Sequence, residues 1–266
     1  MTEHVLVEKS GGVLTLTLNR PEKKNALTRA MYETVGSAID NAPDDPDVRC
    51  ILIQANGDMF TAGNDLSDFA AANRGEGPSG EGDRPRGGSA LITALARAKT
   101  PVVAAVQGRA VGVGVTMLLH CDLVFIAEDA LLTTPFVNLA LVPEAASSIT
   151  LPARIGHARA FAMFVLGEAV TGKQAAEWGI ANLALPAGEV QIRARAAAEA
   201  VASKPPAAVA ITKQLMRESE RYLARIQEEG AHFTAQLKSP EAREAFAAFA
   251  EKRQPDFSNA ARKEPA

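Results

Sequence analysis

The 266-residue sequence has few cysteines, no ligand-spaced histidines and no excess of charge of one sign. Its two cysteines, Cys50 and Cys121, lie in apolar stretches, which predicts buried free thiols and excludes a disulfide framework. The four histidines are scattered, so no metal site is expected. A net charge of −3, with both signs interspersed, argues against a cationic surface for nucleic acid.

Long hydrophobic runs are also absent. The longest, near 101–106 and 110–119, are too short and too rich in Gly and Ala to span a bilayer, so no membrane partner is expected. The first residues run directly into a strand pattern, and the final Lys-Glu-Pro-Ala is not a peroxisomal address. We therefore expect no signal or transit peptide and a cytoplasmic location. A content of 47% hydrophobic and 22% charged residues is that of a globular protein.

Strand and helix patterns alternate through the first two thirds of the chain. Val13–Leu18 alternates with a period of two, which predicts a half-buried strand, and a helix is expected over 28–41 with Thr28 as its N-cap. Further buried strands are predicted at 50–53, 101–106 and 123–126, with helices at 89–99 and 113–120. This order predicts an α/β domain with parallel strand pairing.

The C-terminal part of the sequence predicts helices only. No strand pattern follows about residue 187, and before it Thr171 opens a short helix through a capping box. Ser239 begins a later helix, with Phe246 and Phe249 expected on its inner face. We expect the last 70 or so residues to pack on the body of their own chain and on a neighbouring subunit.

Residues 74–88 are rich in glycine and charge. Such a segment cannot bury enough apolar surface to pack, so it predicts a mobile loop. Because strand and helix patterns continue on both sides, the loop need not be a domain boundary.

Two glycine-containing turns follow predicted buried strands. In 60–66, Gly63 allows a positive φ or the close approach of a ligand, and the N–H of Ala62 is expected to be free to donate. The turn at 108–114 opens an apolar helix, whose first N–H groups are unpaired and lie at the positive end of its dipole. Either turn could instead serve packing alone. Together, two such donors would form an oxyanion hole for a carbonyl oxygen that becomes negative.

A single carboxylate, Glu144, stands in an apolar run after Pro143. It is either a surface turn residue or a proton-transfer group whose pKa is raised by burial. The two glycine-containing turns favour the second interpretation, because an acid beside an oxyanion hole can move a proton next to the bound carbonyl of an ester, a thioester or an enolate precursor.

Six motifs, taken in order, resemble the enoyl-CoA hydratase/isomerase (crotonase) superfamily over nearly the whole chain. They lie at 18–27, 60–66, 101–112, 121–122, 175–180 and 249–257. The resemblance implies a crotonase-type spiral of ββα repeats in residues 1–200 and a helical oligomerisation region in 201–266. It also implies an acyl-CoA thioester substrate, no cofactor besides the CoA of that substrate, and a homotrimer or a hexamer of paired trimers.

The same resemblance implies the residues of the site. The thioester carbonyl would be polarised by the N–H groups of Ala62 and Val113. The substrate and its CoA would contact Lys24, Ala26, Leu27, Ala62, Gly63, Asn64, Asp65, Leu66 and Gly112. Thr116 and Phe136 occupy the positions of the two glutamates of the family's hydratases and would line the pocket. Because neither carries a carboxyl group, hydration by two carboxylates is disfavoured.

The run from 134 to 148 is similar to peroxisomal-type Δ3,Δ2-enoyl-CoA isomerases, whose catalytic glutamate matches Glu144. In that reaction one carboxylate removes a proton from C2 and returns it at C4. Ala140 and Ala145 replace glycines of the subgroup, which could alter the width of the pocket. Two alternatives stay open: a hydratase or other crotonase-type lyase in which Glu144 alone activates water, and an acyl-CoA-binding protein without catalysis.

Overall fold

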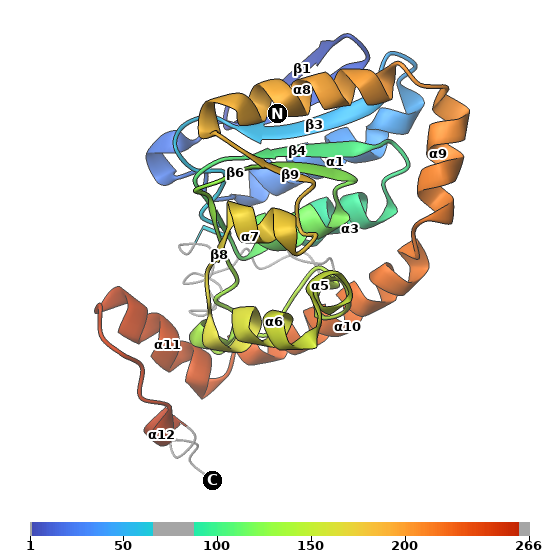
Figure 1. Ribbon diagram of the computed structural model, residues 1–266. Coiled ribbons are helices and arrows are strands. Elements are labelled where there is room, and N and C mark those ends of the chain that lie inside the picture. The colour runs from blue at the N-terminus through green and yellow to red at the C-terminus, as the bar shows by residue number, and fades with distance from the viewer. Residues whose placement is uncertain (1, 66–87, 261–266) are drawn as a thin grey trace.

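The computed structural model describes residues 2–65 and 88–260 (Figure 1). Leu66 and the predicted loop at 74–88, apart from its last residue, lie outside this range. The main sheet has the strand order β1-β2-β3-β4-β6-β9. Its strands are β1 (Val5–Ser10), β2 (Val13–Leu18), β3 (Cys50–Ala55), β4 (Val102–Val106), β6 (Leu123–Ala127) and β9 (Leu183–Leu185). Within this sheet, only the β1–β2 pair is antiparallel, so the predicted α/β domain with parallel pairing is confirmed.

A second, three-stranded sheet has the order β5-β7-β8. Its strands are β5 (Arg109–Val111), β7 (Leu131–Thr133) and β8 (Val170–Thr171). The short β5 follows β4 directly and pairs with β7 in parallel. On its other side, β7 pairs with β8 in antiparallel orientation. After β4 the chain therefore leaves the main sheet, forms β5 in the second sheet and then begins a helix at Val113.

Helices cover both faces of the main sheet, with α8 on one face and α1 and α3 on the other (Figure 1). The α-helices up to residue 202 are α1 (Arg29–Asn41), α3 (Gly88–Arg97), α4 (Val113–Thr116), α5 (Ser147–Ile155), α6 (His157–Phe161), α7 (Gly172–Glu177) and α8 (Ala187–Ala202). Short 3-10 or π segments are η1 (Pro21–Lys23), η2 (Ala42–Asp44), η3 (Met117–His120), η4 (Val137–Leu139) and η5 (Ala162–Leu166). Thr28 and Thr171 cap α1 and α7 as predicted.

The strand β2 is buried at all six positions, so the prediction that it is half-buried was wrong. Its alternating threonines face polar partners rather than water. Thr17 Oγ1 accepts a hydrogen bond from Gln54 at 3.1 Å, and Thr15 Oγ1 accepts one from Arg195 of α8 at 3.2 Å. A period-two pattern of threonine and leucine is therefore compatible with burial on both faces when each hydroxyl finds a donor.

The C-terminal region contains α9 (Pro206–Leu215), α10 (Ser219–Leu237), α11 (Pro240–Ala250) and α12 (Phe257–Ala260). Figure 1 shows α10 passing beneath α3, α5 and α6, and α11 and α12 extending away from the body. Ser239 caps α11 as predicted. Phe246 packs against the core, but Phe249 is 59% exposed, so the prediction that both lie on an inner face was wrong for Phe249. The cause is that α11 extends beyond the body, which covers only one side of it.

Within the described ranges, no helix combines the length and the apolar character needed to cross a membrane. Both cysteines are buried free thiols, as predicted. Burial raises the pKa of each of these thiols to about 12, so neither is a reactive thiolate near neutral pH.

Candidate active site

The two predicted glycine-containing turns lie against each other. Thr61 forms an isolated parallel bridge with Ala110 of β5, in which the Thr61 N–H donates to the Arg109 carbonyl and the Val111 N–H donates to the Thr61 carbonyl, both at 3.1 Å. Gly63 has φ 86°, and a Cβ at that position would lie 2.7 Å from the Val111 carbonyl oxygen. Only glycine therefore allows the first turn to approach the start of α4 this closely.

The N–H of Ala62 is not free, so that prediction was wrong. It donates to the Lys24 carbonyl oxygen at 2.9 Å, because Lys24 and Asn25 both adopt φ 53° and turn that carbonyl toward the loop. The next N–H, of Gly63, donates to the Thr61 hydroxyl at 3.0 Å. Across the described residues, the N–H of Asn64 has no hydrogen-bond partner. The available donor of this turn is therefore Asn64, which the sequence analysis had assigned only to CoA binding.

The second turn presents its donors at the start of α4. Gly112 adopts φ 55° and ψ −114°, and its N–H donates to the Thr133 carbonyl at 2.8 Å. In the part of the chain that the structure describes, the N–H groups of Val113 and Gly114 have no partner. Because it is unpartnered at the start of a helix, the Val113 N–H is a candidate oxyanion donor, as the resemblance implies.

The segment Lys24 to Leu27 lies beside the first turn, as expected for residues that share a ligand. The Leu27 N–H donates to the Gly63 carbonyl at 2.8 Å, and the Leu27 carbonyl accepts from the Asp65 N–H at 3.1 Å. Asp65 also pairs with Arg20 at 2.7 Å, and Arg20 in turn donates to the Ala26 carbonyl at 3.2 Å. These contacts hold the predicted CoA-binding residues of both segments in one place.

Two buried polar groups support this loop. Asn25 is fully buried and its amide donates to the carbonyls of Asn56 and Met59, each at 2.8 Å. The Tyr32 hydroxyl of α1 donates to the side-chain oxygen of Asn64. By contrast, Lys24 is exposed, and its ammonium pairs with Asp58 at 2.8 Å in a surface ion pair. An exposed ion pair of this kind contributes little to stability.

The positions that match hydratase glutamates carry no carboxyl group and are buried. Thr116 is fully buried and its hydroxyl donates to the Val113 carbonyl at 3.4 Å. The Phe136 ring lies 6.0 Å from that of Phe164, and its Cε1 would lie 4.0 Å from a Cβ on Gly112. Phe136 therefore places an apolar surface next to the second turn.

Glu144 is half-buried, which favours the interpretation as a proton-transfer group over that as a surface turn residue. Its Oε1 is shielded from solvent and has no hydrogen-bond partner among the described residues. Burial, followed by the negative charge of Glu229, raises the pKa of the Glu144 carboxyl to about 7. A carboxyl with this pKa exists in both protonation states near neutral pH, which suits a group that must accept and return one proton.

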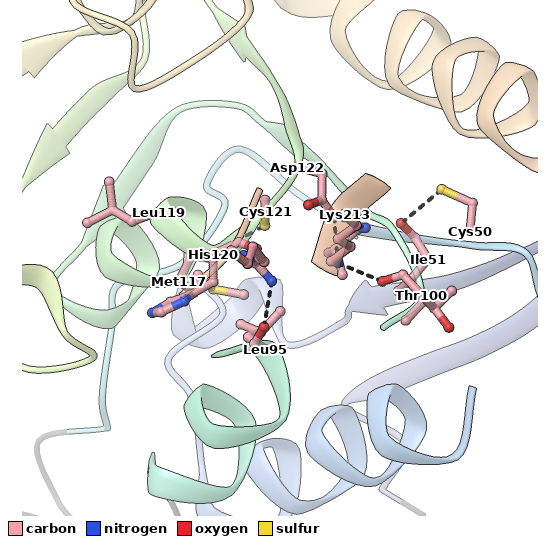
Figure 2. A network of polar contacts seen from close by, with 12 residues as sticks. Cys50, Ile51, Leu95, Thr100, Met117, Leu119, His120, Cys121, Asp122 and Lys213 are labelled. Carbon is pink, nitrogen blue, oxygen red and sulfur yellow. Dashed lines mark hydrogen bonds and ion pairs between the residues drawn. The ribbon is translucent and has the colours of Figure 1, made fainter. Parts of the chain in front are cut away.

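Asp122 anchors a strand, as its position in the sequence indicates. Figure 2 shows Lys213 of α9 next to both Asp122 and Thr100. The Lys213 ammonium lies 2.6 Å from Asp122 Oδ2 and donates to the Thr100 carbonyl at 2.8 Å, and the same Oδ2 accepts the Val102 N–H at 2.7 Å. This ion pair, buried on the Lys213 side and partly exposed on the Asp122 side, ties the C-terminal helices to the edge of β4 and β6. The Asp122 carboxylate therefore has a structural role.

Replacing Gly63 by alanine is expected to destabilise the protein by about 1–3 kcal/mol, because the residue must keep a positive φ while its Cβ meets the Val111 carbonyl. The displaced turn would also move the Asn64 N–H, so activity should fall more than the loss of folded protein explains. Gly188→Ala is the matched control, since a Cβ there has no neighbour within 4 Å. Urea unfolding of both variants checks this, and equal stability of Gly63→Ala and wild type would contradict it.

Replacing Glu144 by glutamine is expected to stabilise the fold at pH 8. Between pH 4.5 and about 7 the folded protein keeps a proton that the unfolded chain has lost, so the raised pKa of Glu144 makes stability fall as pH rises through this window. The variant should gain about 1–3 kcal/mol in free energy of unfolding at pH 8 and much less at pH 5. Urea unfolding at both pH values measures this. A gain that does not change with pH would contradict the assigned pKa.

Comparison with known proteins defines the family. The model of the enoyl-CoA hydratase/isomerase family matches residues 8–260, and the chain belongs to this family, which acts on acyl-CoA thioesters. The structure is similar to that of an enoyl-CoA hydratase/isomerase from Pseudoalteromonas atlantica T6c, with a TM-score of 0.90 and 38% identity over 96% of this chain and 100% of the other. The crotonase-type fold expected from the sequence is thereby confirmed.

Curated relatives carry several activities. The chain is 34% identical to enoyl-CoA delta isomerase 2 of Rattus norvegicus over 82% of its own length, and the match spans 55% of the rat protein. It is 31% identical to 1,2-epoxyphenylacetyl-CoA isomerase of Escherichia coli (strain K12), over 97% of this chain and 99% of that protein. Further relatives are named as a hydratase and as dehydratases. The family is therefore defined, and the reaction must be argued from the site.

Proposed function

We propose that the protein catalyses the Δ3→Δ2 shift of the double bond of an enoyl-CoA thioester, with Glu144 as its single general base and acid. The observation that carries this proposal is that Glu144 is half-buried, with an Oε1 that is shielded from solvent and has no hydrogen-bond partner among the described residues, and that burial raises its pKa to about 7. The residues at the hydratase positions, Thr116 and Phe136, cannot supply a second carboxylate. The sequence similarity to the rat delta isomerase agrees with this choice.

The reaction balances with one carboxylate. The ionised Glu144 takes a proton from C2 of the 3-enoyl thioester, and the electron pair moves into the thioester carbonyl to give a dienolate. The N–H groups of Asn64 and Val113 hold the negative oxygen. The electron pair then returns, the double bond forms between C2 and C3, and C4 takes the proton back from Glu144. The carboxylate is regenerated, and no cofactor beyond the CoA of the substrate is required.

Substrate binding in this proposal uses the residues that the structure gathers around the two turns. Lys24, with its exposed ammonium, is placed to meet a phosphate or other anionic group of CoA. The backbone of Ala26 to Leu27 and of Ala62 to Asp65 would border the thioester and pantetheine portion, and Phe136 would face the acyl chain. Leu66, proposed for the same border, lies outside the described residues.

We also infer a homotrimer, alone or paired into a hexamer, through the region 201–266, and a cytoplasmic location. Apolar side chains on and just after α9 support an oligomer. Ile211, Leu215 and Met216 are 56%, 83% and 79% exposed in the single chain. Such a group of exposed large apolar residues is typical of a protein interface.

A parallel assay tests the proposed reaction. Purified protein is incubated with 3-enoyl-CoA and, separately, with 2-enoyl-CoA of matched chain lengths. We expect conjugated thioester absorption to appear from the first substrate and little loss of it from the second. Rapid loss of conjugation from 2-enoyl-CoA would instead identify a hydratase, and tight binding without conversion of either would identify an acyl-CoA-binding protein.

A further inference from the structure

We propose that Glu229, in the C-terminal helix α10, is a positioning residue for Glu144, which holds the turn that carries Glu144 and places a second negative charge beside it. Glu229 has this role only if Glu144 is the proton-transfer group proposed above. Neither the sequence motifs nor the two glycine-containing turns point to Glu229, which lies more than 80 residues after Glu144.

The turn after Glu144 is unusual for its residue types. Ala145 and Ala146 adopt φ 63° and 55°, the left-handed region that favours glycine. Ala146 is also the N-cap of α5, and its methyl side chain cannot accept the N–H groups at the start of that helix. The backbone that aims the Glu144 side chain is therefore strained and lacks a local cap, so it must be held from elsewhere.

Glu229 supplies the missing cap from α10. Its Oε2 accepts the Ala146 N–H at 2.6 Å and its Oε1 accepts the Ser148 N–H at 3.0 Å, so both carboxylate oxygens hold the turn. Glu229 is only 6% exposed. The carboxylate of a distant helix thus performs the task of an N-cap side chain, with the additional strength of a charged acceptor.

His120 holds the same turn through a second contact. Its Nε2 lies 2.7 Å from the Ala145 carbonyl oxygen, and because a carbonyl only accepts, Nε2 carries the proton. Burial lowers the pKa of His120 to about 4, so the ring is neutral at physiological pH. Arg217 donates to the backbone carbonyls of His120 and Leu95, which fixes the end of η3 (Figure 2 labels His120 and Leu95). The Glu144 turn is therefore held by hydrogen bonds from both η3 and α10.

The charge of Glu229 distinguishes it from a neutral cap. Of the charged groups that the structure describes, Glu229 is the one that acts on Glu144, and it adds to the effect of burial. His120, from η3, contributes no charge because it is neutral. Arg225, one turn before Glu229 on α10, partly offsets the charge of Glu229 and lies 3.3 Å from Glu228. A serine or asparagine cap would satisfy the same N–H groups without this second negative charge.

The variant Glu229→Gln tests the charge. It keeps one oxygen that can accept from the turn and removes the charge, so the acid limb of the kcat/KM profile with 3-enoyl-CoA should move down by about 1 pH unit. Glu229→Ala also removes both hydrogen bonds to the turn. It should lower kcat by about tenfold or more with little change in KM, because only the orientation of the Glu144 side chain is lost. Glu228→Gln, on the exposed side of α10, is the matched control and should leave both quantities unchanged.

A second readout separates this proposal from the proposed reaction. The carboxyl signal of Glu144, identified in ¹³C-labelled protein by its absence in Glu144→Gln, is titrated without substrate. Its midpoint should lie near 7 in the wild type and about 1 unit lower in Glu229→Gln. An unchanged midpoint in folded Glu229→Gln would overturn the role of the charge, and an unchanged kcat in folded Glu229→Ala would overturn the positioning role. If the wild type does not convert 3-enoyl-CoA, the proposed reaction fails while the titration still decides the coupling of the two acids.

Discussion

Glu144→Gln is expected to lower kcat with a 3-enoyl-CoA by about 10²–10⁴-fold, the usual contribution of a general acid–base group. Glutamine has nearly the same shape as glutamate but can neither take the C2 proton nor return it at C4. The N–H groups of Asn64 and Val113 are untouched, so the dissociation constant for an acyl-CoA should stay close to that of the wild type. Steady-state kinetics and calorimetric titration with a saturated acyl-CoA measure the two effects separately.

The matched control is Glu168→Gln, which changes an exposed glutamate of the same domain and should retain full activity. A Glu144→Gln variant as active as the wild type would remove Glu144 from the reaction. A variant that binds acyl-CoA poorly would show instead that the carboxyl contributes to binding in the ground state.

Val113→Pro is expected to lower kcat by about 10²–10³-fold, because proline removes the one N–H that Val113 can offer to the thioester oxygen. Proline is well tolerated at the first position of a helix, where the N–H has no intrahelical partner, so α4 should still form. Because the buried Val113 side chain is also shortened, some stability should be lost, but kcat should fall far more than the loss of folded protein explains. Kinetics and urea unfolding of the same preparation check both points.

Val113→Ala keeps the N–H and shortens the side chain, which makes it the control for lost packing. It should retain most of the activity even if it is somewhat less stable. Equal losses of kcat in the proline and alanine variants would contradict a role for the Val113 N–H, because only the proline variant lacks that donor.

Local signals in the sequence predicted most of the scaffold. Thr28, Thr171 and Ser239 cap the helices that they were expected to begin, because a capping side chain acts within three residues of itself. The continuously apolar segments are buried parallel strands, since both faces of the sheet are covered. Glu144 was recognised as a candidate because it is an isolated acid in an apolar run.

The details of the site depend on contacts between distant segments, which the sequence pattern does not contain. The Ala62 N–H was expected to be free, but a left-handed turn at Lys24 and Asn25 directs a carbonyl onto it, and the free donor is two residues later. Glu229 escaped notice because its charge fits an amphipathic helix, and its contact with the Glu144 turn exists only once α10 has packed beneath α5.

The most direct test of the central claim is a crystal structure of the protein with a bound acyl-CoA that cannot react. We expect the thioester oxygen about 3 Å from the backbone nitrogens of both Asn64 and Val113, with a carboxylate oxygen of Glu144 facing C2 and C4 of the acyl chain. A thioester oxygen held by other groups, or a Glu144 side chain turned away from the acyl chain, would contradict the account.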